Sequence, residues 1–385
     1  VSTHIDQSFP VYLSVKRSTL KFRLKEMFSG KGFFFVLPPI STNLFEYKNF
    51  QNRVISCNSI IRNYFNNKPE LVTIFGLNIN TFLLEFIENV LSQKMYQLNG
   101  DLDSIKKILK IVKPFKVFSQ HSLGIGYALG EICLDLKIPA LLISHGSHVP
   151  HKQFVAKSEW SVHSHTLFNA KYSFIAIQTP WANKFINNEN QVVSKKIITG
   201  PLLIPHEIDS KNNRLQLKKK LYESHANKRI ILHAASPRGW NELRPMVYET
   251  IDEYIKNIND VIKAVDAVPD LFLAIRFRPQ KEFSVDDLML SLENSDCYDV
   301  YIDGVFENYI IASDFLLSYS STTIEQALQY NIPVIQYDSN GKYEHISAEN
   351  LKKNVQKNIS PIYSVMSDRD LISAFRWLNE NHKYT

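Results

Sequence analysis

The sequence predicts an α/β protein built from two Rossmann-like domains, each formed around a parallel sheet. Three observations support this fold class. Short apolar runs recur in both halves of the chain, helix-patterned stretches separate them, and a polar, lysine-rich segment lies between the halves. Strands that alternate with helices of this size are typical of crossover units in a parallel sheet. Several runs are apolar throughout, as expected where helices cover both faces of a sheet.

The length of the chain indicates two domains. A chain of 385 residues is too long for one ordinary core. With 44% hydrophobic and 21% charged residues, the composition is that of an ordinary globular protein. We predict an N-terminal domain over 1–205, a linker over 206–227 and a C-terminal domain over 228–385. No apolar run approaches the roughly 18 residues that a membrane-spanning helix requires.

The expected strands are short apolar runs bounded by turn residues. In the first half they are Phe33–Leu37, Leu71–Phe75, Lys116–Ser119, Ala140–Ser144 and Ser173–Ile177, with a last short strand before Thr199. Helical spacing is found between them, over Asn80–Leu91 and Ile125–Leu136. In the second half the expected strands are Ile230–Ala234, Leu271–Phe277, Asp299–Ile302, Phe315–Leu317 and Pro333–Tyr337. An amphipathic helix is expected over Leu371–Asn379.

The segment from Ala312 to Asp338 is the most informative part of the chain. It has the pattern of a strand, a tight turn, a helix and a second strand, with Ser320, Ser321 and Thr322 in the turn. Hydroxyls and free backbone N–H groups at such a helix start bind anions, above all phosphates. We therefore expect these three residues to bind a phosphate. Glu325 follows on the first helical turn, where it can favour the helix dipole or accept two ribose hydroxyls, and we favour the ribose role.

Candidate acceptor-side residues follow two strands of the first half. His145 comes directly after Ala140–Ser144, and Gly146, Ser147 and His148 continue the turn. An imidazole at this place can take a proton from a hydroxyl near neutral pH, although a histidine that only caps the turn fits the spacing equally well. His121 follows Lys116–Ser119 and opens a helix, which predicts a close-packed turn near the same site.

Basic and hydroxyl residues follow two strands of the second half. Ser236 and Arg238 come after Ile230–Ala234 in a loop suited to approach a phosphate. Arg276 and Arg278 leave the strand Leu271–Phe277 with alternate spacing, and each offers a planar fork for phosphate or carboxylate. The alternative for both groups is a solvated strand end with surface ion pairs.

The sequence favours neither a metal site nor a nucleic-acid partner. Five of the 12 histidines fall between His145 and His165, but no helical H-x-x-x-H pair is present, and Asp101-Leu-Asp103 is best interpreted as helix capping. The three cysteines are far apart, which indicates a reducing compartment without disulfides or a thiolate zinc site. A net charge of +6 would suit an anionic substrate or membrane surface, although a basic solvated face is the commoner explanation.

These residues, in this order, resemble the GT-B glycosyltransferases of bacterial capsule and lipopolysaccharide biosynthesis. The similarity is to the group that contains Kdo and nonulosonate transferases and CDP-glycerol glycerophosphotransferases. It spans Lys116 to Tyr343, and the matching motifs are Ser144-His145-Gly146-Ser147, Arg276-Phe277-Arg278-Pro279, and Asp314, Ser320, Ser321, Glu325 with Pro333-Val334-Ile335. The serine segment is the specific part of this pattern. Arg278 departs from it, because the family often has histidine there.

The resemblance implies two domains that face each other across a cleft. The C-terminal domain would bind a nucleotide-activated sugar donor, and the N-terminal domain a glycan or glycolipid acceptor with His145 as the base. Glu242 and Asp303 are spare carboxylates that could serve as base or nucleophile if the reaction retains anomeric configuration. No metal or other cofactor is implied. The protein would lie in the cytoplasm, either free or peripherally bound to the cytoplasmic face of the inner membrane.

The donor and the reaction remain open between several options. An acidic sugar such as Kdo, sialic or pseudaminic acid, carried by CMP, ranks slightly ahead of a neutral sugar carried by UDP. A polyol-phosphate transferase that uses CDP-glycerol and a UDP-sugar epimerase are alternatives on the same fold. A non-catalytic binding module is least favoured, because polar residues follow strand ends in both halves.

Overall fold

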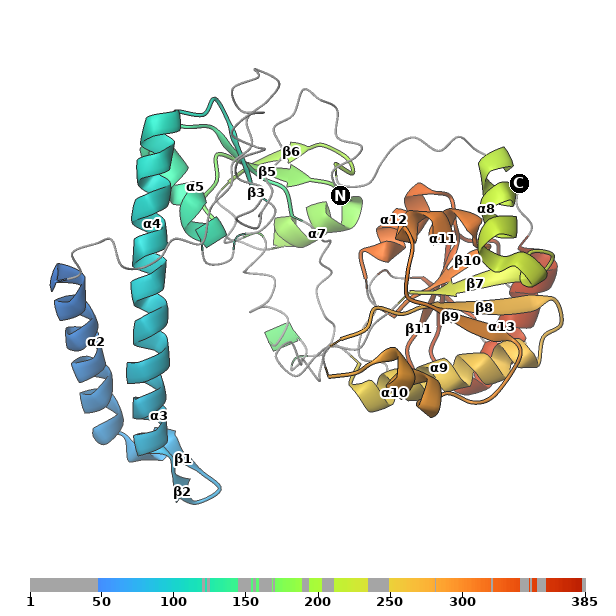
Figure 1. Cartoon of the computed structure of the whole chain (residues 1–385), viewed down its shortest axis with the longest axis horizontal. Helices are drawn as coiled ribbons and strands as arrows, with labels where there is room; N and C mark the ends of the chain where they lie inside the picture. Colours follow the sequence, from blue (N-terminus) through green and yellow to red (C-terminus); the bar gives the residue numbers. More distant parts are fainter. Residues whose placement is uncertain are drawn as a thin grey trace. The chain divides into compact units, whose positions relative to one another are not determined.

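The computed structural model forms two compact units (Figure 1). It describes residues 48–119, 122, 125–144, 154, 157–158, 168, 170–188, 194–202, 211–234, 249–280, 282–319, 321–339, 346, 348–351 and 358–382. The N-terminal unit comprises 1–144, 166–176 and 191–197, and the C-terminal unit comprises the rest, including α7 (Pro180–Asn188). The domain bounds expected from the sequence stay a prediction.

The N-terminal unit contains a four-stranded sheet in the order β3-β4-β5-β6. Its strands are β3 (Val117–Ser119), β4 (Ala140–Leu142), β5 (Phe174–Ile177) and β6 (Lys195–Ile198). β4 pairs in parallel with both β3 and β5, and α5 (Ile125–Asp135) connects β3 to β4. A Cβ atom on Gly130 of α5 would lie 2.7 Å from the Tyr172 ring, so only glycine allows this close packing. The strands and the helix expected here are confirmed.

The first part of the N-terminal unit is helical. Its elements are α2 (Lys48–Asn66), η3 (Pro69–Val72), β1 (Thr73–Ile74), β2 (Leu77–Asn78), α3 (Asn80–Phe86), the π-helical turn η4 (Ile87–Leu91) and α4 (Ser92–Val112). The expectation that Leu71–Phe75 is a strand of the parallel sheet is wrong, because the short strand there, β1, pairs with β2 in a separate two-stranded sheet. Only Thr73 and Ile74 are extended, because Phe75 and Gly76 adopt φ angles of 51° and 80° and turn the chain into an antiparallel hairpin with β2. Phe33–Leu37 lies outside the described residues.

The C-terminal unit contains a seven-stranded sheet in the order β12-β13-β11-β10-β7-β8-β9, in which every neighbouring pair is parallel. The strands are β7 (Arg229–His233), β8 (Leu271–Arg276), β9 (Tyr298–Tyr301), β10 (Phe315–Leu317), β11 (Val334–Tyr337), β12 (Glu349–Asn350) and β13 (Ile362–Val365). The five strands expected from the sequence are confirmed, and β12 and β13 extend the sheet beyond β11.

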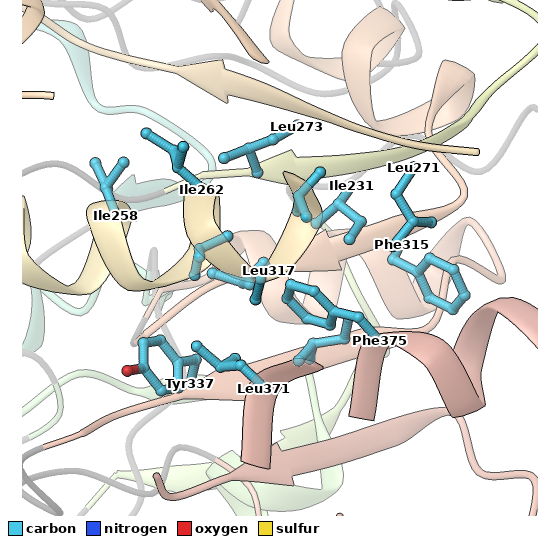
Figure 2. Close-up of a cluster of buried hydrophobic side chains, with 14 of the residues drawn as sticks. Ile231, Ile258, Ile262, Leu271, Leu273, Phe315, Leu317, Tyr337, Leu371 and Phe375 are labelled. Atoms are coloured by element: carbon cyan, nitrogen blue, oxygen red, sulfur yellow. The ribbon is translucent and has the colours of Figure 1, made fainter. Parts of the chain in front are cut away.

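Helices cover both faces of this sheet. On one face lie α9 (Ile251–Asp266), α10 (Val285–Ser291) and α13 (Asp368–Asn381), and on the other α8 (Lys211–Tyr222), α11 (Phe306–Ala312) and α12 (Thr323–Gln329). Figure 2 shows Ile258 and Ile262 of α9 and Phe375 of α13 packed on the first face. Alternate residues of each strand enter the two apolar cores, which explains why these strands are apolar throughout.

Local sequence signals set the ends of the helices on the first face. Thr250 caps α9 and Ser284 caps α10, each in a capping box with the acidic residue three positions later. In the described part of the chain, none of the helices has both the length and the apolar character that crossing a bilayer would take.

A buried ion pair attaches α8 to the amino end of this sheet. The Asp314 carboxylate, just before β10, accepts hydrogen bonds from Arg214 at 3.2 Å and from Lys218 at 2.8 Å. It also accepts the backbone N–H of Ile230 at 2.7 Å, which joins α8, β7 and β10. Part of the segment expected to be a linker is therefore a packed element of the C-terminal unit.

We expect Asp314→Ala to destabilise the C-terminal unit by about 2–4 kcal/mol, because it leaves two partly buried cations and a buried backbone N–H without this acceptor. Urea denaturation followed by circular dichroism measures this change. Lys220→Ala removes an exposed lysine of the same helix and should change the free energy of unfolding by less than about 0.5 kcal/mol. Equal effects of the two substitutions would contradict the assignment.

Candidate functional site

The strand order of the C-terminal unit reverses between β7 and β10. From β7 the chain continues to β8 and β9 on one side, then returns to β10, β11 and β13 on the other. Open parallel sheets bind ligands outside the carboxyl ends of the strands that flank such a reversal. We define the switch-point site as the carboxyl ends of β7 and β10, with the residues that follow them directly.

His233 is the last residue of β7 and lies opposite Leu317, the last residue of β10. Its side chain is only 4% exposed, and its Nδ1 atom has no hydrogen-bond partner among the described residues. Burial lowers the pKa of His233 from 6.5 to about 4, so the imidazole is neutral near pH 7. The Tyr254 ring of α9 lies beside it, with the two ring centroids 5.7 Å apart. A neutral imidazole with an unused ring nitrogen can donate or accept one hydrogen bond from a ligand.

The strand expected over Ile230–Ala234 contains His233, but the sequence did not indicate His233 as a site residue. The sequence does show that His233 follows the apolar run Ile230–Leu232. The unpaired Nδ1 atom and the neighbouring end of β10 depend on the strand order, which the sequence pattern does not specify.

The serine segment forms a turn directly beside His233. Ser318 follows β10, and its hydroxyl donates to the Ala234 carbonyl at 3.2 Å. The Ser321 hydroxyl accepts the backbone N–H of Thr323 at 3.2 Å, which begins α12. Thr322 is exposed and makes no side-chain capping hydrogen bond. The turn thus lies at the carboxyl end of β10, at the switch point, while its contact with a phosphate stays a prediction. Ser320 lies outside the described residues.

Glu325 is on the first turn of α12, and its side chain is 7% exposed. The protein therefore covers most of this carboxylate. Its Oε2 atom is fully buried, and the ribose role stays a prediction.

Arg276 and Arg278 differ in their surroundings. The Arg276 guanidinium donates to the carbonyls of Tyr301 at 2.9 Å and Gly304 at 3.2 Å, and it stacks over the Tyr309 ring at 5.4 Å. These contacts hold the end of β9 and the start of α11 in place. Arg278 is exposed, and no side-chain partner is found for it among the described residues. Of the two, Arg278 has the guanidinium more readily available to an anion, and the donor role of both stays a prediction.

The candidate carboxylates and acceptor-side residues are only partly placed. Asp303 is exposed in the turn after β9, where its backbone carbonyl accepts the Tyr309 hydroxyl at 3.0 Å. The remaining expected site residues lie outside the described residues, namely His121, His145, Gly146, Ser147, His148, Ser236, Arg238 and Glu242. Their roles stay predictions. Among the described residues, no group of three or more histidine, cysteine, aspartate or glutamate side chains could hold a metal ion.

Comparisons with known proteins give structural similarities only. No family model and no curated protein matches the chain. Solved structures that are similar to it include a UDP-GlcNAc 2-epimerase from Neisseria meningitidis bound to UDP-GlcNAc (14% identity, 75% of this chain, 74% of that chain, TM-score 0.49). The S. aureus MnaA–UDP co-structure (14%, 74%, 71%, 0.48) and sucrose-phosphate synthase from Thermosynechococcus elongatus (13%, 74%, 69%, 0.44) are others. At such TM-scores, the assignment to an α/β fold with two Rossmann-like units rests on the sheets themselves.

The lowered pKa of His233 predicts a pH dependence of stability. Below about pH 6.5 the unfolded chain binds a proton at His233 that the folded chain does not, so stability falls as the pH drops toward 4. Between about pH 7.5 and pH 5, the wild type should lose about 2 kcal/mol more than His233→Gln. Urea titrations of both proteins at the two pH values measure the difference. Parallel losses in the two proteins would show that His233 titrates normally.

Proposed function

We propose that this chain is a nucleotide-sugar-dependent enzyme that binds the nucleotide of its donor at the switch-point site. The observation that carries this proposal is the buried, neutral His233 beside the serine turn at the reversal of the strand order. A ring nitrogen without a hydrogen-bond partner, in a covered place at such a reversal, is the arrangement expected for ligand binding.

The chemistry of the site favours a phosphate-bearing ligand. Neutral His233 can donate one N–H bond, and exposed Thr322 can donate its hydroxyl from the start of α12. Exposed Arg278, at the end of the neighbouring strand β8, would add the positive charge that a phosphate needs. A leaving nucleotide phosphate stabilised by such groups is the main electrostatic requirement of glycosyl transfer.

We propose glycosyl transfer as the reaction, with the N-terminal unit binding a glycan or glycolipid acceptor. The resemblance of the strand-end motifs to GT-B glycosyltransferases supports this, with His145 as the base and Glu242 or Asp303 as further carboxylates. The preferred donor is an acidic sugar carried by CMP, and a UDP-sugar is the alternative. Peripheral binding to the cytoplasmic face of the inner membrane belongs to the same proposal.

A thermal-shift panel with CMP, CDP, UDP and GDP tests the nucleotide site. A nucleotide at 100 times its dissociation constant should stabilise the wild type by about 2.7 kcal/mol. His233→Ala should abolish the shift, because it removes the buried hydrogen-bond donor. His225→Ala is the matched control, since His225 stacks on Phe272 near the amino end of the sheet, with ring centroids 4.0 Å apart.

The nucleotide that gives the shift identifies the donor class. CMP would support an acidic-sugar donor, UDP a UDP-sugar, and CDP a polyol-phosphate transferase. A wild type that no nucleotide stabilises, or an unchanged shift in His233→Ala, would overturn the proposed site.

Incubation with the identified donor alone separates transfer from epimerisation. A transferase should leave most of the donor intact until a glycan acceptor is added, because the attacking hydroxyl is missing. An epimerase should isomerise the sugar or release the nucleotide without any acceptor. Nuclear magnetic resonance of the sugar anomeric protons distinguishes these products, and isomerisation of the donor alone would refute glycosyl transfer.

A further inference from the structure

A polar chain connects α9 to the segment before it and to the segment after β11. Asn257 of α9 is 3% exposed, and its Nδ2 atom donates to Glu249 Oε1 at 2.5 Å. Its Oδ1 atom accepts the Ser339 hydroxyl at 2.6 Å. Glu249 directly precedes the cap of α9, and Ser339 is the second residue after β11. Asn257 and Ser339 are 82 residues apart in the chain, so one amide joins the start of α9 to the segment after β11.

This polar chain lies next to His233. Tyr254, whose ring contacts the His233 ring, is one helical turn before Asn257 on the same face of α9. Burial raises the pKa of Tyr254, and the charge of nearby Glu249 raises it further. Tyr254 thus contacts the end of β7 from α9, and Asn257 follows it on the same helix face.

An amide is chemically required at position 257. Its two ends make opposite demands, because Glu249 needs a donor and the Ser339 hydroxyl needs an acceptor. Buried polar groups of this kind cost stability unless every member is paired, so an apolar side chain at position 257 would leave Glu249 and Ser339 without this partner. Retaining a polar bridge here makes sense if the bridge holds the segments that it joins in a defined position.

We propose that Asn257 is a positioning residue of the switch-point site, which acts by holding Ser339 after β11 and Glu249 before α9. This inference rests on the proposed nucleotide site. It assigns no contact between Asn257 and the ligand, since the side chain is enclosed by its two partners. The effect reaches the ligand through Ser339 after β11 and through α9, whose Tyr254 ring lies beside His233.

The test compares binding of CMP, CDP, UDP and GDP by isothermal titration calorimetry in the wild type, in Asn257→Ala and in a matched control, Asn259→Ala. Asn259 lies two residues further along α9 and also bridges two segments, donating to the Ser291 carbonyl at 3.0 Å and accepting the Glu293 N–H at 2.9 Å. Both substitutions should lower the melting temperature. Only Asn257→Ala should weaken nucleotide binding, by roughly tenfold or more, measured well below the melting temperature.

A milder variant and a double variant guard against simple misfolding. Ser339→Ala removes one hydroxyl and should weaken binding in the same direction with little loss of stability. If Asn257 acts through Ser339, the double variant should lose no more affinity than Asn257→Ala alone. Additive losses would mean that Ser339 contacts the ligand independently, and would overturn the assignment.

The failure of this inference can be told from the failure of the proposed function. Wild-type binding combined with unchanged affinity in Asn257→Ala, or with equal losses in Asn259→Ala, overturns the positioning role alone. A wild type that binds none of CMP, CDP, UDP and GDP overturns the nucleotide site and the positioning role together.

Discussion

The parallel pairing of β7 with β10 is the constraint on which the C-terminal unit depends. Parallel strands need crossover connections, and the chain leaves β7 toward one side of the sheet and β10 toward the other. The connection after β7 leads to β8 and the connection after β10 leads to β11, on opposite sides. The carboxyl ends of β7 and β10 are therefore neighbours, and no crossover helix in the described part of the chain covers the space between them. His233, Ala234 and Ser318 come together there for this reason, although 84 residues separate Ala234 from Ser318.

Polar groups at the amino end of the sheet are paired, whereas one at the carboxyl end has no partner among the described residues. At the amino end, Asp314 is paired with two cations, and the Arg229 guanidinium donates to the carbonyls of Leu378, Asn379 and His382 at the end of α13. These charges stabilise the unit, because each one is paired with groups from another element that would otherwise lack a partner. At the carboxyl end, His233 keeps an unused ring nitrogen under cover. That contrast separates groups that stabilise the unit from a group suited to a ligand.

Much of the C-terminal sheet could be predicted from the sequence, and less of the site. β7 to β11 are continuous apolar runs, because helices cover both faces, and such runs are conspicuous. Leu71–Phe75 has the same apolar character but becomes a hairpin through the positive φ angles of Phe75 and Gly76, which apolar patterning does not report. Arg276 illustrates the limit for site residues, since its contacts with the Tyr301 and Gly304 carbonyls depend on how β9 pairs with β8.

The sequence by itself determined the fold class, the strands of the C-terminal sheet and the place of the serine turn at the start of a helix. These features follow from local patterns, namely apolar runs, turn residues and helical spacing. Tertiary structure decided which strand ends become neighbours and therefore which polar groups meet. His233 is buried by residues from other parts of the chain. The bonds of Asp314 to α8 and of Asn257 to Ser339 also join residues far apart in the sequence. Such contacts are set by strand order, which no local pattern encodes.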